Sequence, residues 1–316
     1  MIEFRYPTQA TYMNIAATST RKTKLLPYLA LVIGILALSL SAMFVRWADA
    51  PGPITGFYRL FFAAFMLAPF FAYRCLKNCT LNRTNIIFPI LGGLFSAFDL
   101  AFWNTSLDYT TASNATLLGN TAPLWVALVA MLVFREKLKK DFWLGLGLAL
   151  CGAALVMSAD FFIHPTIGIG DLMASAAGVF YAGYYLATQR GRQHLDPISY
   201  IWLVAVSASL GLLVINLALG FPLTGYTTQT WLVFLATALV SQIIGYVAVS
   251  YALGHLPASV VAPTMIGQPV MTTILAIPLL KEVPQPIQLL GGIAVLAGIY
   301  LVHQSHGRNL AGKLDA

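Results

Sequence analysis

The strongest constraint on this chain is a series of apolar stretches, each long enough to cross a lipid bilayer. A membrane-spanning helix needs about 20 mainly apolar residues. Short connections such as 108–111 and 254–258 would join neighbouring helices as antiparallel pairs. The pattern predicts an all-α polytopic membrane protein with ten transmembrane helices, at residues 27–47, 54–74, 86–107, 112–133, 142–159, 172–189, 198–219, 230–253, 259–280 and 286–303.

The scarcity of charge supports this prediction. Only 9% of the residues are charged and 59% are hydrophobic, whereas a soluble domain carries roughly 25% charged residues. Such a chain cannot cover a surface that faces water, so its partner is the lipid bilayer. The net charge of +7 is explained by basic loops at the membrane surface, and we expect no nucleic-acid partner.

The placement of lysine and arginine predicts the orientation. With the N-terminus inside, every basic residue except Arg46, Arg59 and Lys281 lies in a segment on the inner side. Basic residues collect in cytoplasmic loops, so both termini are predicted to be cytoplasmic. Residues 1–26 are expected to form a disordered cytoplasmic tail, and residues 304–316 a second cytoplasmic tail.

The two halves of the chain repeat. Residues 104–157 align without gaps on residues 250–303 at a shift of 146, and the alignment matches one proline, one basic–Glu pair and two glycines of each copy. The matched positions are Pro123 with Pro269, Arg135–Glu136 with Lys281–Glu282, Gly145 with Gly291, and Gly152 with Gly298. The predicted repeats are 27–159 and 172–303. Because each holds five helices, an odd number, the second copy is inverted in the membrane, as is typical of secondary transporters.

The ten helices, the two five-helix repeats and the basic–Glu pair that ends the fourth and ninth helices resemble the EamA family of the drug/metabolite transporter superfamily. The resemblance covers residues 27–303. It implies a permease that carries a small molecule by alternating access, with no cofactor, in a bacterial inner membrane. Members of the family often export amino acids or related metabolites, and others move sugars, nucleotide sugars or drugs. Ten helices could enclose a cavity within one chain, so we expect a functional monomer.

Two charged residues, Arg59 and Asp99, lie within predicted spans. A lone charge in the membrane needs a partner or a wet cavity. The depths of the two residues differ by only ~4.5 Å at 1.5 Å per residue, within the reach of an arginine side chain. They either form a structural ion pair, or Asp99 faces the cavity and binds a substrate amine or carries a proton.

Pro123 and Pro269 each lie about twelve residues into a span. A proline within a helix removes a backbone donor and displaces the carbonyl four residues earlier, which is that of Gly119 for Pro123. Polar side chains share faces beside these prolines: Thr116 with Asn120, and Thr264 with Gln268. These faces either form part of a central site or make hydrogen bonds between helices.

Three tyrosines in the spans are candidates for lining a cavity. Tyr181 and Tyr185 lie one helical turn apart, and Tyr246 lies in the middle of its span. A tyrosine in a dry span needs a partner for its hydroxyl group. A cavity with aromatic walls and little charge would suit neutral or zwitterionic metabolites.

Glu136 and Glu282 repeat but would lie on opposite sides of the membrane, so they cannot share a catalytic site. A salt bridge at a helix end or at a gate is the expected role for each.

The sequence contains none of the motifs H-E-x-x-H, G-x-S-x-G or Walker A, so neither an enzyme nor an ATP-driven pump is expected. Two neighbouring cysteines, Cys75 and Cys79, are too few to hold a metal. A membrane sensor or receptor, or a facilitative channel without ion coupling, stays as the alternative to a transporter.

Overall fold

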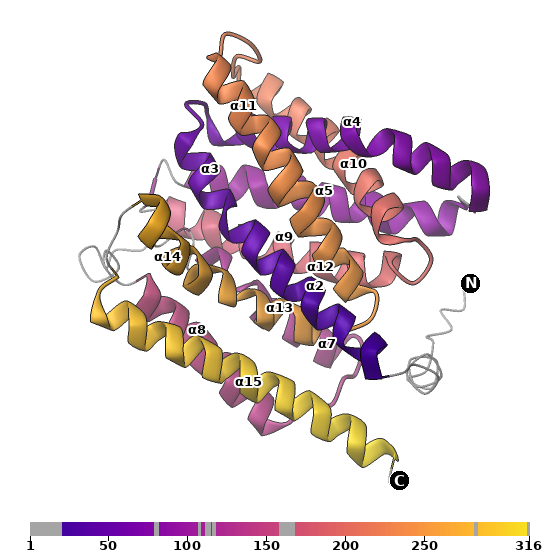
Figure 1. The fold of residues 1–316 in the computed structure, drawn as a ribbon, viewed down its shortest axis with the longest axis vertical. Coiled ribbons are helices and arrows are strands. Elements are labelled where there is room, and N and C mark those ends of the chain that lie inside the picture. The colour runs from indigo at the N-terminus through magenta and orange to yellow at the C-terminus, as the bar shows by residue number, and fades with distance from the viewer. Residues whose placement is uncertain are drawn as a thin grey trace.

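The computed structural model describes residues 21–78, 82–106, 109–110, 115, 118–157, 168–280 and 284–314. All the regular secondary structure in these ranges is helical (Figure 1). The helices are α2 (Arg21–Ser39), α3 (Ser41–Trp47), α4 (Gly52–Asn78), α5 (Arg83–Ser106), α7 (Ala122–Leu132), α8 (Lys140–Val156), α9 (Ile169–Gly191), α10 (Pro197–Ala218), α11 (Thr228–Thr237), η1 (Ala238–Gly245), α12 (Tyr246–Leu253), α13 (Ala258–Met265), α14 (Gly267–Leu280) and α15 (Pro286–Leu314).

Seven helical segments in the described part of the chain are long and apolar enough to cross a membrane. They are Leu25–Val45, Gly52–Lys77, Asn85–Ser106, Pro197–Ala218, Thr228–Leu253, Ala258–Leu279 and Pro286–Gly307, and α7 is a shorter apolar helix. This chain is therefore a multi-pass membrane protein. The predicted spans 142–159 and 172–189 fall on α8 and α9, which are not among the seven.

Several long helices are interrupted. A turn at Leu40 separates α2 from α3, and Ile266 separates α13 from α14. Between α11 and α12 the chain forms the π-helix η1. The three elements follow one another without a break, so they form one continuous helical segment. π-Helical turns are rare and occur frequently at functional sites.

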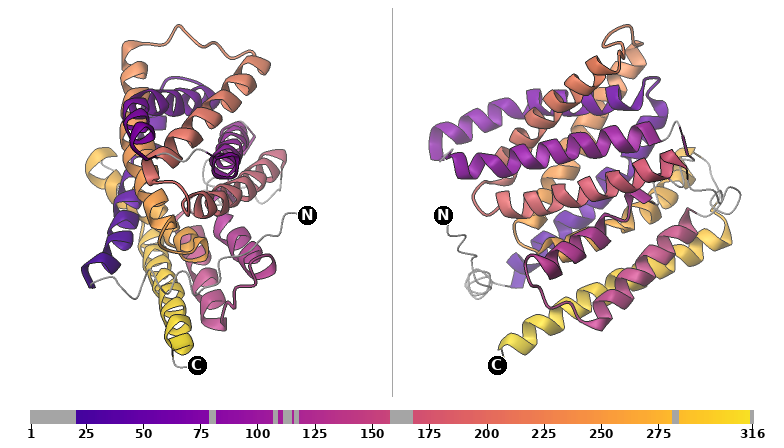
Figure 2. Two further views of the ribbon diagram at one scale, coloured as in Figure 1. Left: turned by 90° about the vertical axis from the view of Figure 1, so that its right-hand side faces the viewer. Right: turned by 180° about the vertical axis from the view of Figure 1, so that it is seen from behind.

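The most extensive contact between two described helices joins α8 to α15, which run beside each other along one edge of the molecule (Figure 2). Their backbones meet at glycines: a Cβ atom added to Gly145 would lie 2.8 Å from the carbonyl oxygen of Gly298. One added to Gly152 would lie 2.7 Å from that of Gly291. Small residues allow helix backbones to approach closely, and at these two positions even a Cβ atom would clash with the facing backbone.

The remaining helices pack around the middle of the bundle. Helix α5 packs against α9 and α10, and α10 also packs against α4. Helix α2 lies against η1 and α12 and contacts α14. The largest buried cluster of side chains includes Tyr184, Tyr185, Tyr246 and Met265, so the predicted aromatic positions lie within the protein and not at its lipid surface.

Candidate functional site

A small cavity lies where the start of α7, helix α9 and the junction of α13 and α14 meet. It is lined by Asn120, Ala122 and Pro123 before and within α7, by Tyr181 and Tyr185 of α9, and by Ala262, Met265, Ile266 and Gln268 around the junction of α13 and α14. The cavity volume is only about 10 Å³, which is close to the minimum for one water molecule. The structure therefore shows this site closed.

The first wall depends on the position of Pro123. Helix α7 begins at Ala122, so Pro123 lies in its first turn, where a backbone N–H has no partner within the helix. The residues just before form a turn, in which the Thr121 amide donates to the Leu118 carbonyl at 3.1 Å. Gly178 of α9 lies against this turn, because an added Cβ would be 2.8 Å from the Thr121 hydroxyl.

The second wall is the junction between α13 and α14. Helix α13 ends at Met265 and α14 begins at Gly267. The Ile266 amide donates to the Pro263 carbonyl at 3.1 Å, which is a bond of the tighter 3₁₀ type. Pro269 is buried in the first turn of α14, so Pro123 and Pro269 hold equivalent places after two helix starts.

The predicted tyrosines lie together. The Tyr185 hydroxyl donates to the Tyr181 hydroxyl at 2.9 Å, and the two ring centroids are 4.6 Å apart. Tyr184 meets Tyr246 edge to face at 5.5 Å. These rings join α9 to α12 through contacts of the kind that aromatic pairs prefer.

Arg59 of α4 reaches the same cluster. Its guanidinium lies 5.5 Å from the centre of the Tyr246 ring, within the range of a cation–π contact. Its Nη1 donates to the Ser41 hydroxyl at 3.4 Å, a long hydrogen bond. The Nε atom is buried and has no partner among the described residues. Arg59 is 7% exposed, so its guanidinium lies inside the protein with the Nε donor unused among the described residues.

Asp99 of α5 completes the cluster. Asp99 is a partly exposed residue, and its carboxyl group interacts electrostatically with Arg59 and with Tyr181, Tyr185 and Tyr246. Within the described part of the chain, however, no contact salt bridge joins Arg59 to Asp99. Of the two alternatives for these residues, the structural ion pair is not present as a direct contact, and the guanidinium lies against Ser41 and Tyr246. The site thus brings a guanidinium and a carboxyl group into one cluster without a salt bridge in direct contact between them among the described residues.

Other predicted residues lie elsewhere. Thr264 donates to the Val260 carbonyl at 2.7 Å and pairs with His303 of α15 at 2.8 Å, so it joins two helices and does not line the cavity beside Gln268. Gly119 packs at the Trp103 ring, with an added Cβ 3.2 Å from it. Thr116 and Glu282 lie outside the described residues.

Glu136 follows the end of α7, where Arg135 has a positive φ of 51°. This left-handed residue reverses the chain and allows the Glu136 amide to donate to the Ala130 carbonyl at 2.9 Å. The Glu136 carboxylate accepts a hydrogen bond from the Ser259 hydroxyl of α13 at 2.7 Å. The structure thus gives Glu136 a neutral hydroxyl partner across the two halves of the chain, where a salt bridge was expected.

Four residues of this region were not selected from the sequence. Tyr184 has a buried hydroxyl without a partner among the described residues, and the same holds for the Oε1 atom of Gln242 in η1. The other two are Ser259, which bonds to Glu136, and His303, which pairs with Thr264. An amide in the middle of an apolar span, such as Gln242, is the signal that could have been used.

No group of three or more His, Cys, Asp or Glu side chains among the described residues could hold a metal ion. Cys75 and Cys151 are free thiols, and Cys79 lies outside the described residues.

Comparison with known proteins gives the family. The model of the EamA-like transporter family matches residues 25–158 and again residues 168–304. The chain belongs to the EamA-like transporter family. It is 32% identical over 209 residues, 64% of this chain and 70% of the other, to a protein of Archaeoglobus fulgidus named an uncharacterized transporter.

Two further similarities extend this picture. A protein of Streptantibioticus cattleyicolor, named a probable terminal-alkyne amino-acid exporter, is 25% identical over 210 residues, 66% of this chain and 68% of the other. A solved crystal structure, 16% identical, covers 90% of this chain and 98% of its own with a TM-score of 0.73. That structure shares the fold. As a member of this family the chain is a transporter, and nothing points to catalytic activity.

Proposed function

We propose that this EamA-family transporter is a secondary carrier, and that it exports amino acids or related zwitterionic metabolites across a bacterial inner membrane by alternating access. The observation that carries the proposal is the buried cluster of Arg59, Asp99 and the tyrosines beside a closed cavity between two proline-started helices. An amino acid presents one carboxylate and one ammonium group. Arg59 and Asp99 supply the two complementary charges.

The carrier mechanism requires two halves that exchange roles, and we propose ten spans arranged as two inverted five-helix repeats. The reciprocal glycine contacts of α8 and α15 support this arrangement. The shift of 146 carries Gly145 to Gly291 and Gly152 to Gly298. It therefore turns the Gly145–Gly298 contact into the Gly291–Gly152 contact, which is what a pseudo-two-fold axis between the two helices would produce.

The other helix contacts also come in pairs, in which a contact in one half has its equivalent in the other half, as the same pseudo-two-fold axis requires. The packing of α5 on α9 has its counterpart in that of η1 and α12 on α2, and the packing of α7 on α9 has its counterpart in that of α14 on α2. The packing of α10 on α5 corresponds to that of α4 on η1 and α11. Both proline-started helices then face the centre from opposite halves.

A mechanism follows from the closed cavity. A volume of about 10 Å³ holds no metabolite, so α7, α9 and the α13–α14 junction must separate for substrate to enter. The substrate carboxylate would bind the guanidinium of Arg59, whose Nε atom has no partner among the described residues, and the substrate ammonium group would bind the Asp99 carboxyl group. Tyr181 and Tyr246 would close over the aliphatic part. A proton on Asp99 would compete with the substrate amine, and this competition would couple export to the proton gradient.

The test is transport in proteoliposomes that contain a panel of amino acids, polyamines, sugars and aromatic compounds, with and without a proton gradient. We expect amino acids to move and Asp99→Asn to abolish the response to the gradient. Asp49→Asn, which changes an exposed acid, is the matched control and should behave as wild type.

Arg59→Gln should raise the KM for amino acids at least tenfold, because a charge-assisted hydrogen bond is lost. Transport of sugars or cationic drugs in place of amino acids would reject the zwitterion assignment. Equal transport by wild type and Asp99→Asn with and without the gradient would make the protein a facilitator. If no compound moves, a sensor would be the better assignment.

A further inference from the structure

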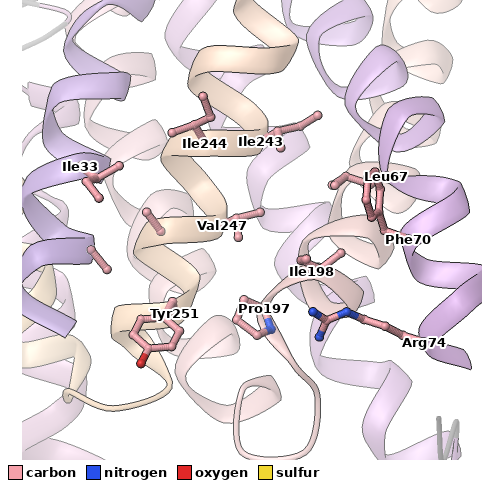
Figure 3. A pocket seen from close by; sticks show the side chains of 12 residues that line it. Ile33, Leu67, Phe70, Arg74, Pro197, Ile198, Ile243, Ile244, Val247 and Tyr251 are labelled. Carbon is pink, nitrogen blue, oxygen red and sulfur yellow. The ribbon is translucent and has the colours of Figure 1, made fainter. Parts of the chain in front are cut away.

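A second and much larger hollow lies on the side of the bundle, away from the Arg59–Asp99 cluster. It is a groove of about 460 Å³ between α2, α4, the start of α10, and η1 with α12 (Figure 3). The residues that form it are Ala30, Ile33, Leu67, Phe70, Arg74, Pro197, Ile198, Ile243, Ile244, Val247, Ala248 and Tyr251.

The groove opens towards lipid. Ile33, Phe70 and Ile244 are 48%, 58% and 45% exposed, and all three lie within helices long and apolar enough to cross the membrane. Large side chains of this kind contact acyl chains in a bilayer. A groove with such a rim is accessible from within the membrane rather than from water.

The walls are apolar except at one end. Arg74 and Tyr251 lie at the same end of the groove, on either side of Pro197, while Leu67 and Ile244 lie further along it (Figure 3). Leu67 to Arg74 and Ile244 to Tyr251 are each seven residues, or ~10 Å of helix. One leaflet of the hydrocarbon core is ~15 Å thick. The groove therefore extends from a polar end through about two thirds of a leaflet.

The polar end carries an excess of positive charge. Arg74 pairs with Asp196 through Nη1 at 2.7 Å, which uses one of the five donors of the guanidinium. Its side chain is 45% exposed. Lys77 is exposed one turn further along α4 and stacks on Tyr73 at 4.5 Å. Arg192, whose Nε donates to the Ser250 carbonyl at 2.9 Å, lies beside Tyr251. The side chains near this end thus include three cations, Arg74, Lys77 and Arg192, and one carboxylate, Asp196.

We propose that this groove binds an anionic phospholipid of the leaflet on the basic side of the protein, with one acyl chain along the apolar walls and the phosphate at Arg74. The groove matches such a lipid in two respects. Its apolar walls suit the acyl chain, and the hydrogen-bond donors and net positive charge at its polar end suit the anionic phosphate. Clusters of basic residues at the membrane surface attract anionic lipids. The bound chain would connect α4 and α12, the helices that carry Arg59 and Tyr246. The inference does not depend on which substrate the protein carries.

The experiment measures lipid binding to the purified full chain in detergent by native mass spectrometry, with dioleoyl-phosphatidylglycerol and dioleoyl-phosphatidylcholine as probes. We expect one phosphatidylglycerol to bind at least fivefold more tightly than phosphatidylcholine. Ala248→Phe, which fills the groove, should abolish this binding. Val214→Phe adds the same bulk to an exposed position of α10 and should leave it unchanged.

Arg74→Gln should weaken the binding of phosphatidylglycerol about tenfold, as expected for the loss of a charge-assisted hydrogen bond. Lys139→Gln, at an exposed cation outside the groove, should have no effect. Ile33→Trp obstructs the groove from its exposed rim and replaces Ala248→Phe if that variant does not fold. Equal lipid binding by the groove-filling and control variants would overturn the proposal. Displacement of the lipid by inorganic phosphate alone would reduce the groove to an anion site and overturn it as well.

Discussion

At the scale of single residues, this protein keeps polar groups inside the membrane without pairing them completely. Arg59 uses a long hydrogen bond and an aromatic ring, and its Nε atom, the Tyr184 hydroxyl and the Gln242 amide oxygen are buried without partners among the described residues. Each such group destabilises the fold. A carrier has a reason to retain them, because a substrate or a proton can use them.

Gln242→Met should therefore stabilise the protein. The change removes a buried amide oxygen without a partner and keeps a similar volume, so the unfolding free energy should rise by about 1 kcal/mol. Transport should fall if the amide contacts substrate. Thermal unfolding in detergent and proteoliposome uptake measure the two effects. A fall in the unfolding temperature would show that Gln242 makes a bond that stabilises the closed structure.

Ser259→Ala should have the opposite effect on stability. It removes the hydroxyl that donates to the Glu136 carboxylate at 2.7 Å, and a hydrogen bond to a charged group contributes about 1.5–3 kcal/mol. Ser209→Ala is the matched control, since the Ser209 hydroxyl is also buried but bonds only to the Val206 carbonyl of its own helix. An equal decrease in unfolding temperature for both variants would contradict a special role for the Glu136–Ser259 bond.

At the scale of helices, the structure depends on where two helix backbones pack closely together and where a helix is interrupted. The small residues of α8 allow the approach of α15, while Pro123 and Pro269 fix the starts of α7 and α14. Glycine acts by letting a second backbone approach, and proline acts by fixing the backbone where a helix starts. These positions should therefore respond to substitution far more strongly than their exposure or polarity would suggest.

The two glycines Gly145 and Gly147 test this directly on one helix. A Cβ at Gly145 would lie 2.8 Å from the Gly298 carbonyl, whereas one at Gly147 would meet nothing within 4 Å. We expect Gly145→Val to lower the unfolding free energy by about 2 kcal/mol or more through overpacking. Gly147→Val should change it by less than about 0.5 kcal/mol. Similar unfolding temperatures for the two variants would show that α8 and α15 can move apart freely.

At the scale of the whole molecule, the central cavity is closed and the two halves are joined by the Glu136–Ser259 hydrogen bond. Alternating access requires this contact to open in each cycle. The contact is close and joins the segment after α7 in the first half to the start of α13 in the second half, so a covalent link at this place should stop the cycle without filling the substrate site.

We expect a short thiol-reactive crosslinker to block transport in a Glu136→Cys, Ser259→Cys variant whose natural cysteines are replaced by serine. The loss should exceed tenfold, and reduction of a cleavable crosslinker should restore the rate. The two single-cysteine variants treated with the same reagent are the controls. Full transport by the crosslinked double variant would mean that this end of the protein stays closed throughout the cycle.

The sequence by itself determined that the chain is an all-helical membrane protein and a transporter, because apolar length, scarce charge and family motifs are local properties of the chain. It also selected Tyr181, Tyr185, Asn120 and Gln268, which line one cavity. Only the tertiary structure decided that Arg59 turns to Tyr246 and not to Asp99, that Thr264 pairs with His303, and that Glu136 bonds to Ser259. The partner of a side chain depends on which helix faces it, and helical spacing alone gives only the face, not the neighbour.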